Sequence, residues 1–220
     1  MLNFSTSEEN YLKTIFHLQT KDSNVTTNEL AERLHARPAS ITDMMKKLKT
    51  RKLVNYQPYR GFRLTLEGKK AALNIIRRHR LWEYFLAAKL KFNWDEVHEV
   101  AEQLEHVSNK KLIDKLDEYL SYPKFDPHGD PIPDTNGKME PSKQISLTEL
   151  HLNKPARICY VANRSELLME HLQEKKIKIG ASVMVKRKFS YDDSLEIKLD
   201  NKLALTISGQ LAKNIFVKHG

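Results

Sequence analysis

The chain has 220 residues, of which 40% are hydrophobic and 30% are charged, which is enough for two or three small domains with buried cores. No stretch approaches the ~20 apolar residues that span a bilayer, and the N-terminal MLNFSTSEEN lacks the basic-then-apolar order of a signal peptide. The single cysteine, Cys159, excludes an intrachain disulfide and is interpreted as a small buried hydrophobe. We therefore expect a cytoplasmic protein with no membrane partner.

The net charge of +9 indicates a polyanionic partner, and the charge is unevenly distributed along the chain. Residues 1–75 contain 13 Lys and Arg against 7 Asp and Glu, residues 76–140 contain 10 against 13, and residues 141–220 contain 14 against 8. An acidic middle segment therefore separates two basic ones, and the basic segments need separate explanations.

The first third of the sequence predicts three helices followed by a hairpin. Capping residues and apolar periodicity indicate the helices, and alternating residues around a Pro- and Gly-containing turn indicate the strands. The expected helix starts are Ser7–Asn10, Thr26–Glu29 and Pro38, and the expected strands are 53–56 and 62–65. This order describes a winged helix-turn-helix domain, to which residues 1–75 are assigned.

In such a domain the third helix enters the major groove, so its exposed side chains should be small or polar and its flanks basic. The segment after Pro38 fits this expectation, and double-stranded DNA is the predicted partner. The candidate DNA-binding residues are Ala39, Ser40, Thr42 and Asp43 for base edges, and Arg37, Lys46, Lys47, Arg60 and Arg63 for the flanks and the wing. The alternative interpretation is that these lysines form an ordinary solvated helix face.

The middle of the chain predicts three amphipathic helices. Their expected spans are from Glu67 to about Leu90, from Asp95 to about Ser108, and from Asn109 to Leu120. Three helices of this size have more apolar surface than they can cover alone, which favours a homodimer. A dimer also suits a helix-turn-helix protein that reads two half-sites of an operator.

The last part of the chain predicts a small β domain. A segment with four prolines and two glycines, Tyr122–Lys138, closes the middle domain of residues 76–140, and a linker at 141–152 follows. Short strands then predict an SH3-like barrel over 153–220. The expected strands are 156–162, 182–189, 195–199, 203–207 and 214–217, with a helix at 165–174 and turns at Gly180 and Gly209. The expected fold class is therefore mainly α with a small β domain.

The stretch HEVAEQLEHVS, residues 98–108, contains two histidines and three glutamates within an otherwise amphipathic helix. Residues that are three or four positions apart share a helix face. The pairs with this spacing are His98 with Glu102, Glu102 with Glu105 and His106, and His79 with Glu83. Imidazoles and carboxylates that converge from two helices would form a shell that suits Mn(II), Fe(II) or Zn(II). A solvent-facing rim of His and Glu would give the same pattern.

Three motifs carry a resemblance to a known family. They are RxHRLWEYFL at 77–86, VHEVAEQLEHVS at 97–108 and DPHGDPIP at 126–133. With a winged helix-turn-helix before them and a β domain after them, the whole chain resembles the DtxR/MntR family of metal-dependent transcriptional repressors. The resemblance implies a homodimeric repressor of metal-uptake genes, with a FeoA-like third domain and no enzymatic activity.

The resemblance also implies a metal site. Its matching residues are His79, Glu102, Glu105 and His106, with Asn10 as a further ligand from the first helix. The iron-responsive branch has cysteine at the position of Glu102, so the harder carboxylate favours Mn(II), with Fe(II) or Zn(II) as alternatives. A family glutamate ligand falls at Lys13, which cannot coordinate while protonated, and this argues against a close two-metal cluster.

A second metal site is implied for three-domain members of the family. Its candidate ligands are Glu83, His98, Asp126 and His128, with Glu166 or Glu170 from the β domain. The alternative for His128 is a turn histidine that caps backbone carbonyls.

Two rival functions remain open at this point. A metal-independent winged-helix regulator with an organic effector would keep its response when Glu102 or His106 becomes alanine. A helix-bundle metallohydrolase could use Glu105 as a general base, but the sequence has no HExxH motif and such an enzyme would leave the DNA-binding end unexplained.

Overall fold

The computed structural model describes residues 4–19, 23–57, 61–93, 96–140, 144–162, 165–200 and 202–219. The chain divides into two compact units, one of residues 1–85, 99–123 and 132–139 and one of residues 86–98, 124–131 and 140–220. Within the described ranges, no helix combines the length and the apolar character that crossing a membrane requires.

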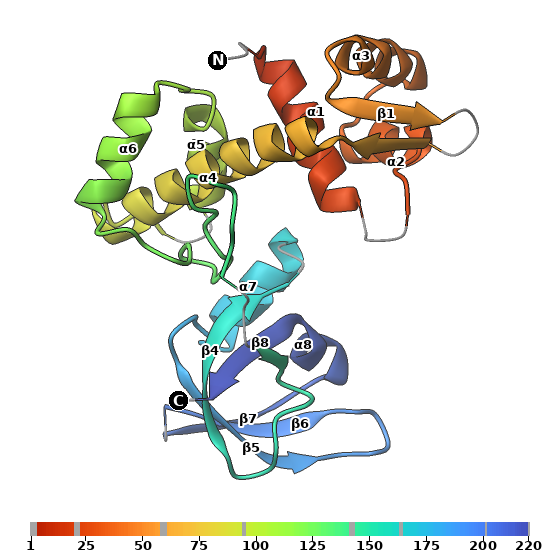
Figure 1. Cartoon of the computed structure of the whole chain (residues 1–220). Coiled ribbons are helices and arrows are strands. Elements are labelled where there is room, and N and C mark those ends of the chain that lie inside the picture. Colours follow the sequence, from red (N-terminus) through yellow and green to blue (C-terminus); the bar gives the residue numbers. More distant parts are fainter. Residues whose placement is uncertain are drawn as a thin grey trace. The chain divides into compact units, whose positions relative to one another are not determined.

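The first unit begins with three helices and a two-stranded hairpin (Figure 1). These elements are α1 (Thr6–Leu18), α2 (Thr27–Arg33), α3 (Pro38–Thr50), β1 (Val54–Gln57) and β2 (Gly61–Leu64). The strands are antiparallel, with Val54 opposite Leu64. One apolar core, which includes Leu12, Ile15, Leu30, Ile41 and Leu48, joins the helices to the hairpin. The predicted winged helix-turn-helix is confirmed.

Capping boxes explain where α1 and α2 begin. The Ser5 hydroxyl accepts the Glu8 backbone N–H while the Glu8 carboxylate accepts the Ser5 backbone N–H, and Thr26 and Glu29 repeat this exchange in α2. The α2 cap was predicted correctly, but the predicted start of α1 at Ser7 was late. Ser5 has a glutamate three residues later, whereas Ser7 has an asparagine there, so only Ser5 can complete the box.

Three further helices complete the first unit and extend into the second: α4 (Leu66–Ala88), α5 (Val97–Leu104) and α6 (Lys110–Tyr119). The start of α4 lies directly against the residue that precedes β1, because a Cβ on Gly68 would stand 1.9 Å from the carbonyl oxygen of Leu53. Helices α4 and α6 pack around a small apolar cluster of Leu81, Ile113, Leu116, Leu120 and Ile132. A buried ion pair, in which Arg77 donates to Asp117 at 2.7 Å, joins α4 to α6.

Helix α5 is shorter than its sequence pattern predicts. It ends at Leu104 instead of near Ser108, so Glu105 and His106 lie in the turn that follows it. Arg78 of α4 explains part of this end, because its Nε donates to the carbonyl oxygen of Glu105. That oxygen is thus held by a side chain, which is one of the ways in which terminal helix carbonyls are satisfied.

The second unit contains a six-stranded sheet in the order β3-β8-β4-β5-β6-β7. Its elements are β3 (Ile145–Ser146), β4 (Pro155–Val161), α7 (Glu166–Glu174), β5 (Ser182–Lys188), β6 (Leu195–Leu199), β7 (Leu203–Ile207), α8 (Gly209–Asn214) and β8 (Ile215–His219). The predicted β domain is confirmed, and β6 and β7 have the predicted bounds. Both β3 and α8 were missed, and Gly209 begins a helix that is capped by Ser208.

The Pro-rich segment contains a tight turn at Asp126–Asp130. The Asp126 carboxylate accepts the backbone N–H groups of His128 and Asp130, at 2.8 and 2.9 Å. Gly129 has φ +88°, and a Cβ there would stand 1.6 Å from the carbonyl oxygen of Cys159 in β4. This close approach requires glycine, and it packs the turn against the sheet of the same unit.

Candidate metal centre and DNA-binding surface

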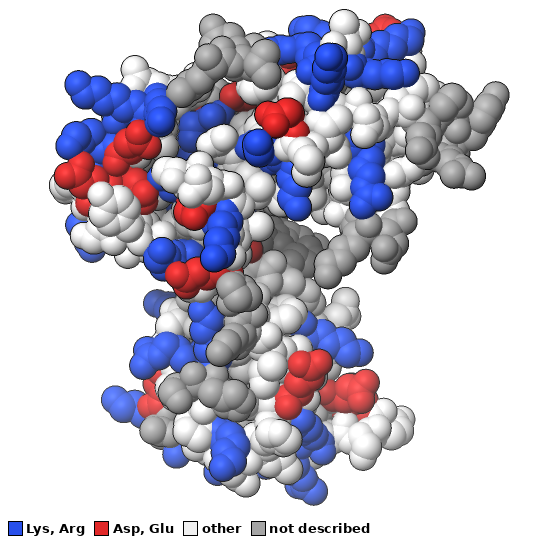
Figure 2. Space-filling view, in the orientation of Figure 1, with Lys and Arg blue, Asp and Glu red and all other residues white. Residues whose placement is uncertain are grey.

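The exposed face of α3 has the composition that the sequence predicts for a DNA-reading helix. Its exposed side chains are Ala39, Ser40, Thr42, Asp43, Lys46 and Lys47, while Ile41, Met45 and Leu48 are buried. Figure 2 shows Lys and Arg gathered over the part of the first unit that carries α3. Arg37 at the start of α3 and Arg63 on β2 are also exposed, and Arg60 lies outside the described residues.

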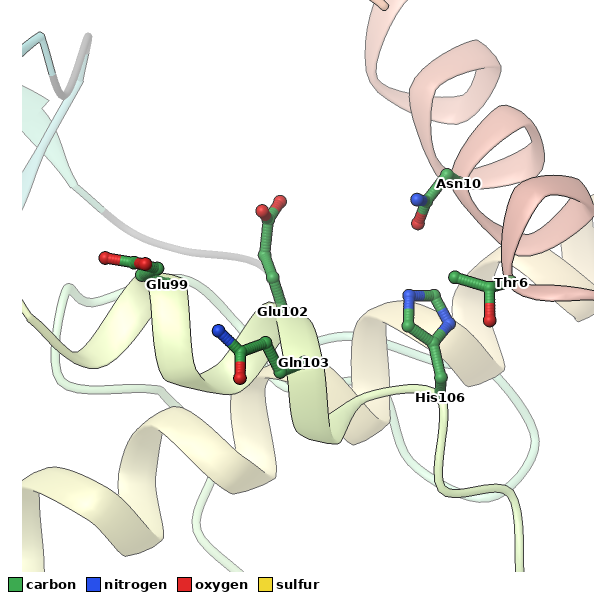
Figure 3. A pocket seen from close by; sticks show the side chains of 6 residues that line it. All are labelled: Thr6, Asn10, Glu99, Glu102, Gln103 and His106. Carbon is green, nitrogen blue, oxygen red and sulfur yellow. The ribbon is translucent and has the colours of Figure 1, made fainter.

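An open pocket of about 330 Å³ separates α1 from α5. Figure 3 shows the six lining residues, with Asn10 of α1 and Glu102 of α5 pointing into the same space and the His106 ring beside them. The other lining residues are Thr6, Glu99 and Gln103. Three of the predicted metal ligands therefore face one pocket, although they come from segments about ninety residues apart in the sequence.

Glu105 is buried and connects the predicted ligands to one another. Its Oε2 lies 2.7 Å from His79 Nδ1, and its Oε1 lies 3.7 Å from His106 Nε2. Burial alone would raise the pKa of Glu105, but the hydrogen bond with His79 and the nearby charge of Lys13 lower it. Glu105 is therefore held as a carboxylate, the form that can bind a cation.

His79 lies between two carboxylates, those of Glu105 and Glu83. Its Nε2 lies 3.0 Å from Glu83 Oε1, on the side opposite to its contact with Glu105. Burial would lower the pKa of His79, but Glu105 and Glu83 raise it to about 9. His98, which was predicted to join Glu83 in the second site, is exposed on α5. His79 thus contacts donors of both predicted sites.

Three charged residues at this centre were not proposed as ligands from the sequence. Glu9 of α1 is buried, and its carboxylate is shared by Arg78 and by His106, whose Nδ1 lies 2.6 Å from Glu9 Oε2. Lys13 contacts Glu105 Oε1 at 2.7 Å. The sequence feature that could have indicated Glu9 and Lys13 is their i, i+4 spacing, which places both side chains on one face of α1.

Glu9 has a defined effect on the His106 ring. When Nδ1–H donates to the Glu9 carboxylate, Nε2 carries the lone pair and can act as a ligand. A carboxylate that orients a ligating histidine in this way is a common outer partner in metal sites.

The remaining predicted ligands lie in the second unit. Asp126 and His128 are buried in the turn described above, and Glu170 is exposed on α7. The side chain of Glu166 lies outside the described residues. The assignment of these residues to a second metal site stays a prediction.

The donor set around the pocket fits a divalent cation. Glu102 and Glu105 supply carboxylate oxygens, His106 supplies an imidazole nitrogen and Asn10 supplies an amide oxygen. Such mixed nitrogen and oxygen donors suit Mn(II), Fe(II) and Zn(II) rather than metals that need thiolate.

Family models match three successive segments of the chain. They describe an iron-dependent repressor N-terminal DNA-binding domain at residues 3–62, an iron-dependent repressor metal-binding and dimerisation domain at 65–134, and a FeoA domain at 145–219. Together these segments carry every candidate ligand named above.

Individual proteins that are similar to this chain are also transcriptional regulators or repressors. The HTH-type transcriptional regulator MntR of Oceanobacillus iheyensis is 32% identical over 120 residues, which are 54% of this chain and 81% of that protein. The iron-dependent repressor IdeR of Mycobacterium leprae is 28% identical over 173 residues, covering 76% and 73% of the two chains. A solved structure of a manganese-dependent transcriptional repressor complex with manganese superposes with a TM-score of 0.82 at 28% identity, covering 96% of this chain and 99% of that one.

A winged helix-turn-helix, a metal-binding and dimerisation domain and a FeoA domain in this order define a metal-dependent DNA-binding transcriptional repressor rather than an enzyme. The expected fold class and function class are confirmed. The chain belongs to the DtxR/MntR family of iron- and manganese-dependent repressors.

Proposed function

We propose that the chain is a homodimeric cytoplasmic repressor of metal-uptake genes whose DNA binding is strengthened by Mn(II), with Fe(II) or Zn(II) as alternatives. One observation carries this proposal. Asn10 belongs to the DNA-binding domain, whereas Glu102 and His106 belong to the metal-binding domain, and all three line one pocket. A ligand held by these side chains joins the two domains.

The side chains at the pocket have two roles, because some supply charge and others fix the position of a ligand atom. Glu102 and Glu105 place two carboxylates close to α1, where Asn10 contributes a neutral oxygen. His106 is oriented by Glu9, which is itself part of α1. These side chains would hold a divalent cation, which would supply positive charge to the carboxylates and would link α1 to α5. Since α1 packs against α2 and β2, its position also sets that of α3.

This arrangement makes metal binding and DNA binding linked equilibria. Suppose that the form in which metal joins α1 to α5 is also the form that fits the two half-sites of an operator. Metal then raises the affinity for DNA, and DNA raises the affinity for metal by the same factor. Coupling of this kind is typically ~1–3 kcal/mol, which corresponds to roughly 5–150-fold in affinity.

The choice of Mn(II) rests on the ligand at position 102. A carboxylate at this position is a harder donor than a thiolate, and carboxylates favour Mn(II) over softer metals. The similar solved structure that contains manganese supports the same choice.

Dimer formation is supported by apolar side chains that the first unit leaves exposed. Leu112 and Tyr119 of α6 and Tyr122 after it are 42%, 62% and 60% exposed. Phe85 of α4 lies against Tyr119, with ring centroids 6.3 Å apart. An exposed aromatic patch on a domain that the family model names for dimerisation fits a contact between two copies.

The decisive experiment measures DNA binding of the metal-free protein with Mn(II), Fe(II) or Zn(II) added, at fixed salt. A duplex obtained by in vitro selection serves as the operator. Mn(II) is expected to strengthen binding of the wild type by about 5–150-fold, and Glu105→Gln should remove this response because it removes a buried anionic donor. Glu118→Gln, an exposed glutamate on α6, is the matched control and should respond like the wild type.

The same titration tests metal selectivity and the rival function. Glu102→Cys should shift the preference from Mn(II) toward Fe(II), and an unaltered ranking of the metals would reject the role of Glu102 in selectivity. A wild type that responds to no metal, or a His106→Ala variant that responds fully, would favour a regulator with an organic effector.

A further inference from the structure

Lys13 places a positive charge directly on the carboxylates of the proposed metal site. Its Nζ lies 2.7 Å from Glu105 Oε1 and 3.4 Å from Glu102 Oε1. The Lys13 side chain is only 14% exposed and that of Glu105 is fully buried, so the pair is shielded from solvent. Two candidate ligands are therefore already in contact with a cation that belongs to the chain.

This contact differs from the lysine–glutamate pairs on the surface of the same unit. Lys115 and Glu118 are also 2.7 Å apart, but they are neighbours on α6 and are 67% and 55% exposed. Lys13 instead reaches from α1 to a residue that is 92 positions away in the sequence. Screening by water and salt is strong for the α6 pair and weak for a shielded pair, so the charge of Lys13 has the larger effect on its surroundings.

An ammonium group and a divalent cation require the same oxygen atoms. A metal ion bound through Glu105 Oε1 must displace the Lys13 ammonium from that atom or accept its positive charge at close range. Either event disfavours metal binding relative to a site without the lysine. The cost is largest at the site to which Glu105 contributes, because Lys13 contacts Glu105 directly.

We propose that Lys13 is a tethered competitor that weakens metal binding at the Glu102, Glu105 and His106 site. It thereby sets the metal concentration to which the repressor responds. This inference rests on the proposed function, because it needs a metal site at these residues, but it adds a residue that opposes binding.

The test is calorimetric titration of the full-length, metal-free protein with manganese(II) chloride, in the absence of DNA. The component of the isotherm that disappears in Glu105→Gln is assigned to this site. Lys13→Met, which keeps the length and removes the charge, is expected to strengthen that component about tenfold, equivalent to about 1.4 kcal/mol. Lys13→Arg keeps the charge and Lys115→Met removes an exposed lysine, so both are expected to stay within about twofold of the wild type.

Two results would overturn the role of Lys13. If Lys13→Met binds Mn(II) no more tightly than the wild type, the lysine is only a structural partner of Glu105. If Lys13→Met and Lys13→Arg both strengthen Mn(II) binding to the same extent, the charge of the lysine is not the cause. Thermal melts by circular dichroism check folding, and if the methionine variant does not fold, Lys13→Gln decides by the same criterion. If Glu105→Gln removes no component from the isotherm, the proposed site itself is wrong, which is a separate failure.

Discussion

The buried charged side chains of the first unit and the exposed ones along α3 belong to the same compact unit but are held in different ways. Glu9, Glu105 and Arg77 are 4%, 0% and 4% exposed, and each is fixed by partners on another helix. Lys46, whose side chain is 74% exposed, pairs with Asp43, which lies one helical turn away and is equally exposed. The buried charges hold the helices in position relative to one another, whereas the exposed charges on α3 can contact a polyanion such as DNA.

The difference in burial predicts a difference in the cost of mutation. Removal of one partner of a buried pair leaves an uncompensated charge and costs several kcal/mol, whereas an exposed pair contributes little. Three substitutions probe this contrast, from the centre of the helical domain outward.

The largest effect is expected for Asp117→Ala. The change leaves the Arg77 guanidinium buried without its carboxylate partner, although its contact with the carbonyl oxygen of Pro133 remains, and it should lower the free energy of unfolding by about 3–5 kcal/mol. Urea denaturation of the metal-free protein measures this loss. Asp43→Ala removes an exposed pair and should change stability by less than about 0.5 kcal/mol. Equal losses in the two variants would remove the distinction between inner and outer charges.

A smaller effect is expected for Glu9→Gln. The amide keeps the shape of the side chain but loses the charge that orients His106 and pairs with Arg78. Because outer partners of ligating histidines typically contribute 10–100-fold to metal affinity, Mn(II) binding should weaken about tenfold. Calorimetry measures the affinity, with Glu118→Gln as the control. Unchanged affinity would mean that the His106 ring needs no support from α1.

The smallest effect is expected for Lys46→Ala on α3. Loss of one phosphate contact should weaken DNA binding nearly equally for all sequences and reduce the slope of log K against log salt by about 0.9 for each lysine removed. Binding measured at several salt concentrations gives this slope, and Lys115→Ala on α6 is the control. A slope that does not change would place Lys46 away from the DNA backbone.

The DNA-binding domain could be predicted closely because its signals are local. The capping box of Thr26 and Glu29 and the proline at the start of α3 each act within one helical turn, and the structure has both. One error in the C-terminal β domain is also local in origin. Residues 209–214 form the short helix α8, which has too few residues to show a helical period before β8 begins.

The candidate site could be predicted only in part. Helical spacing places Glu102 near His106, and the resemblance adds Asn10, but no periodicity indicates that Glu9 pairs with a histidine 97 residues away. That contact depends on how α1 packs against the end of α5, which the sequence pattern does not specify. The early end of α5 had the same cause, since a guanidinium from another helix holds its last carbonyl.

Arg78 has a consequence for how movement spreads through the first unit. Its planar head group donates through Nε to the backbone at the end of α5 and through Nη2 to Glu9 of α1. Because the two donors belong to one rigid plane, α1 cannot tilt without turning that plane away from α5. Arg78 therefore links α1 of the DNA-binding domain to the end of α5 through one planar group, and a lysine, with a single ammonium group, would not hold both acceptors in this fixed geometry.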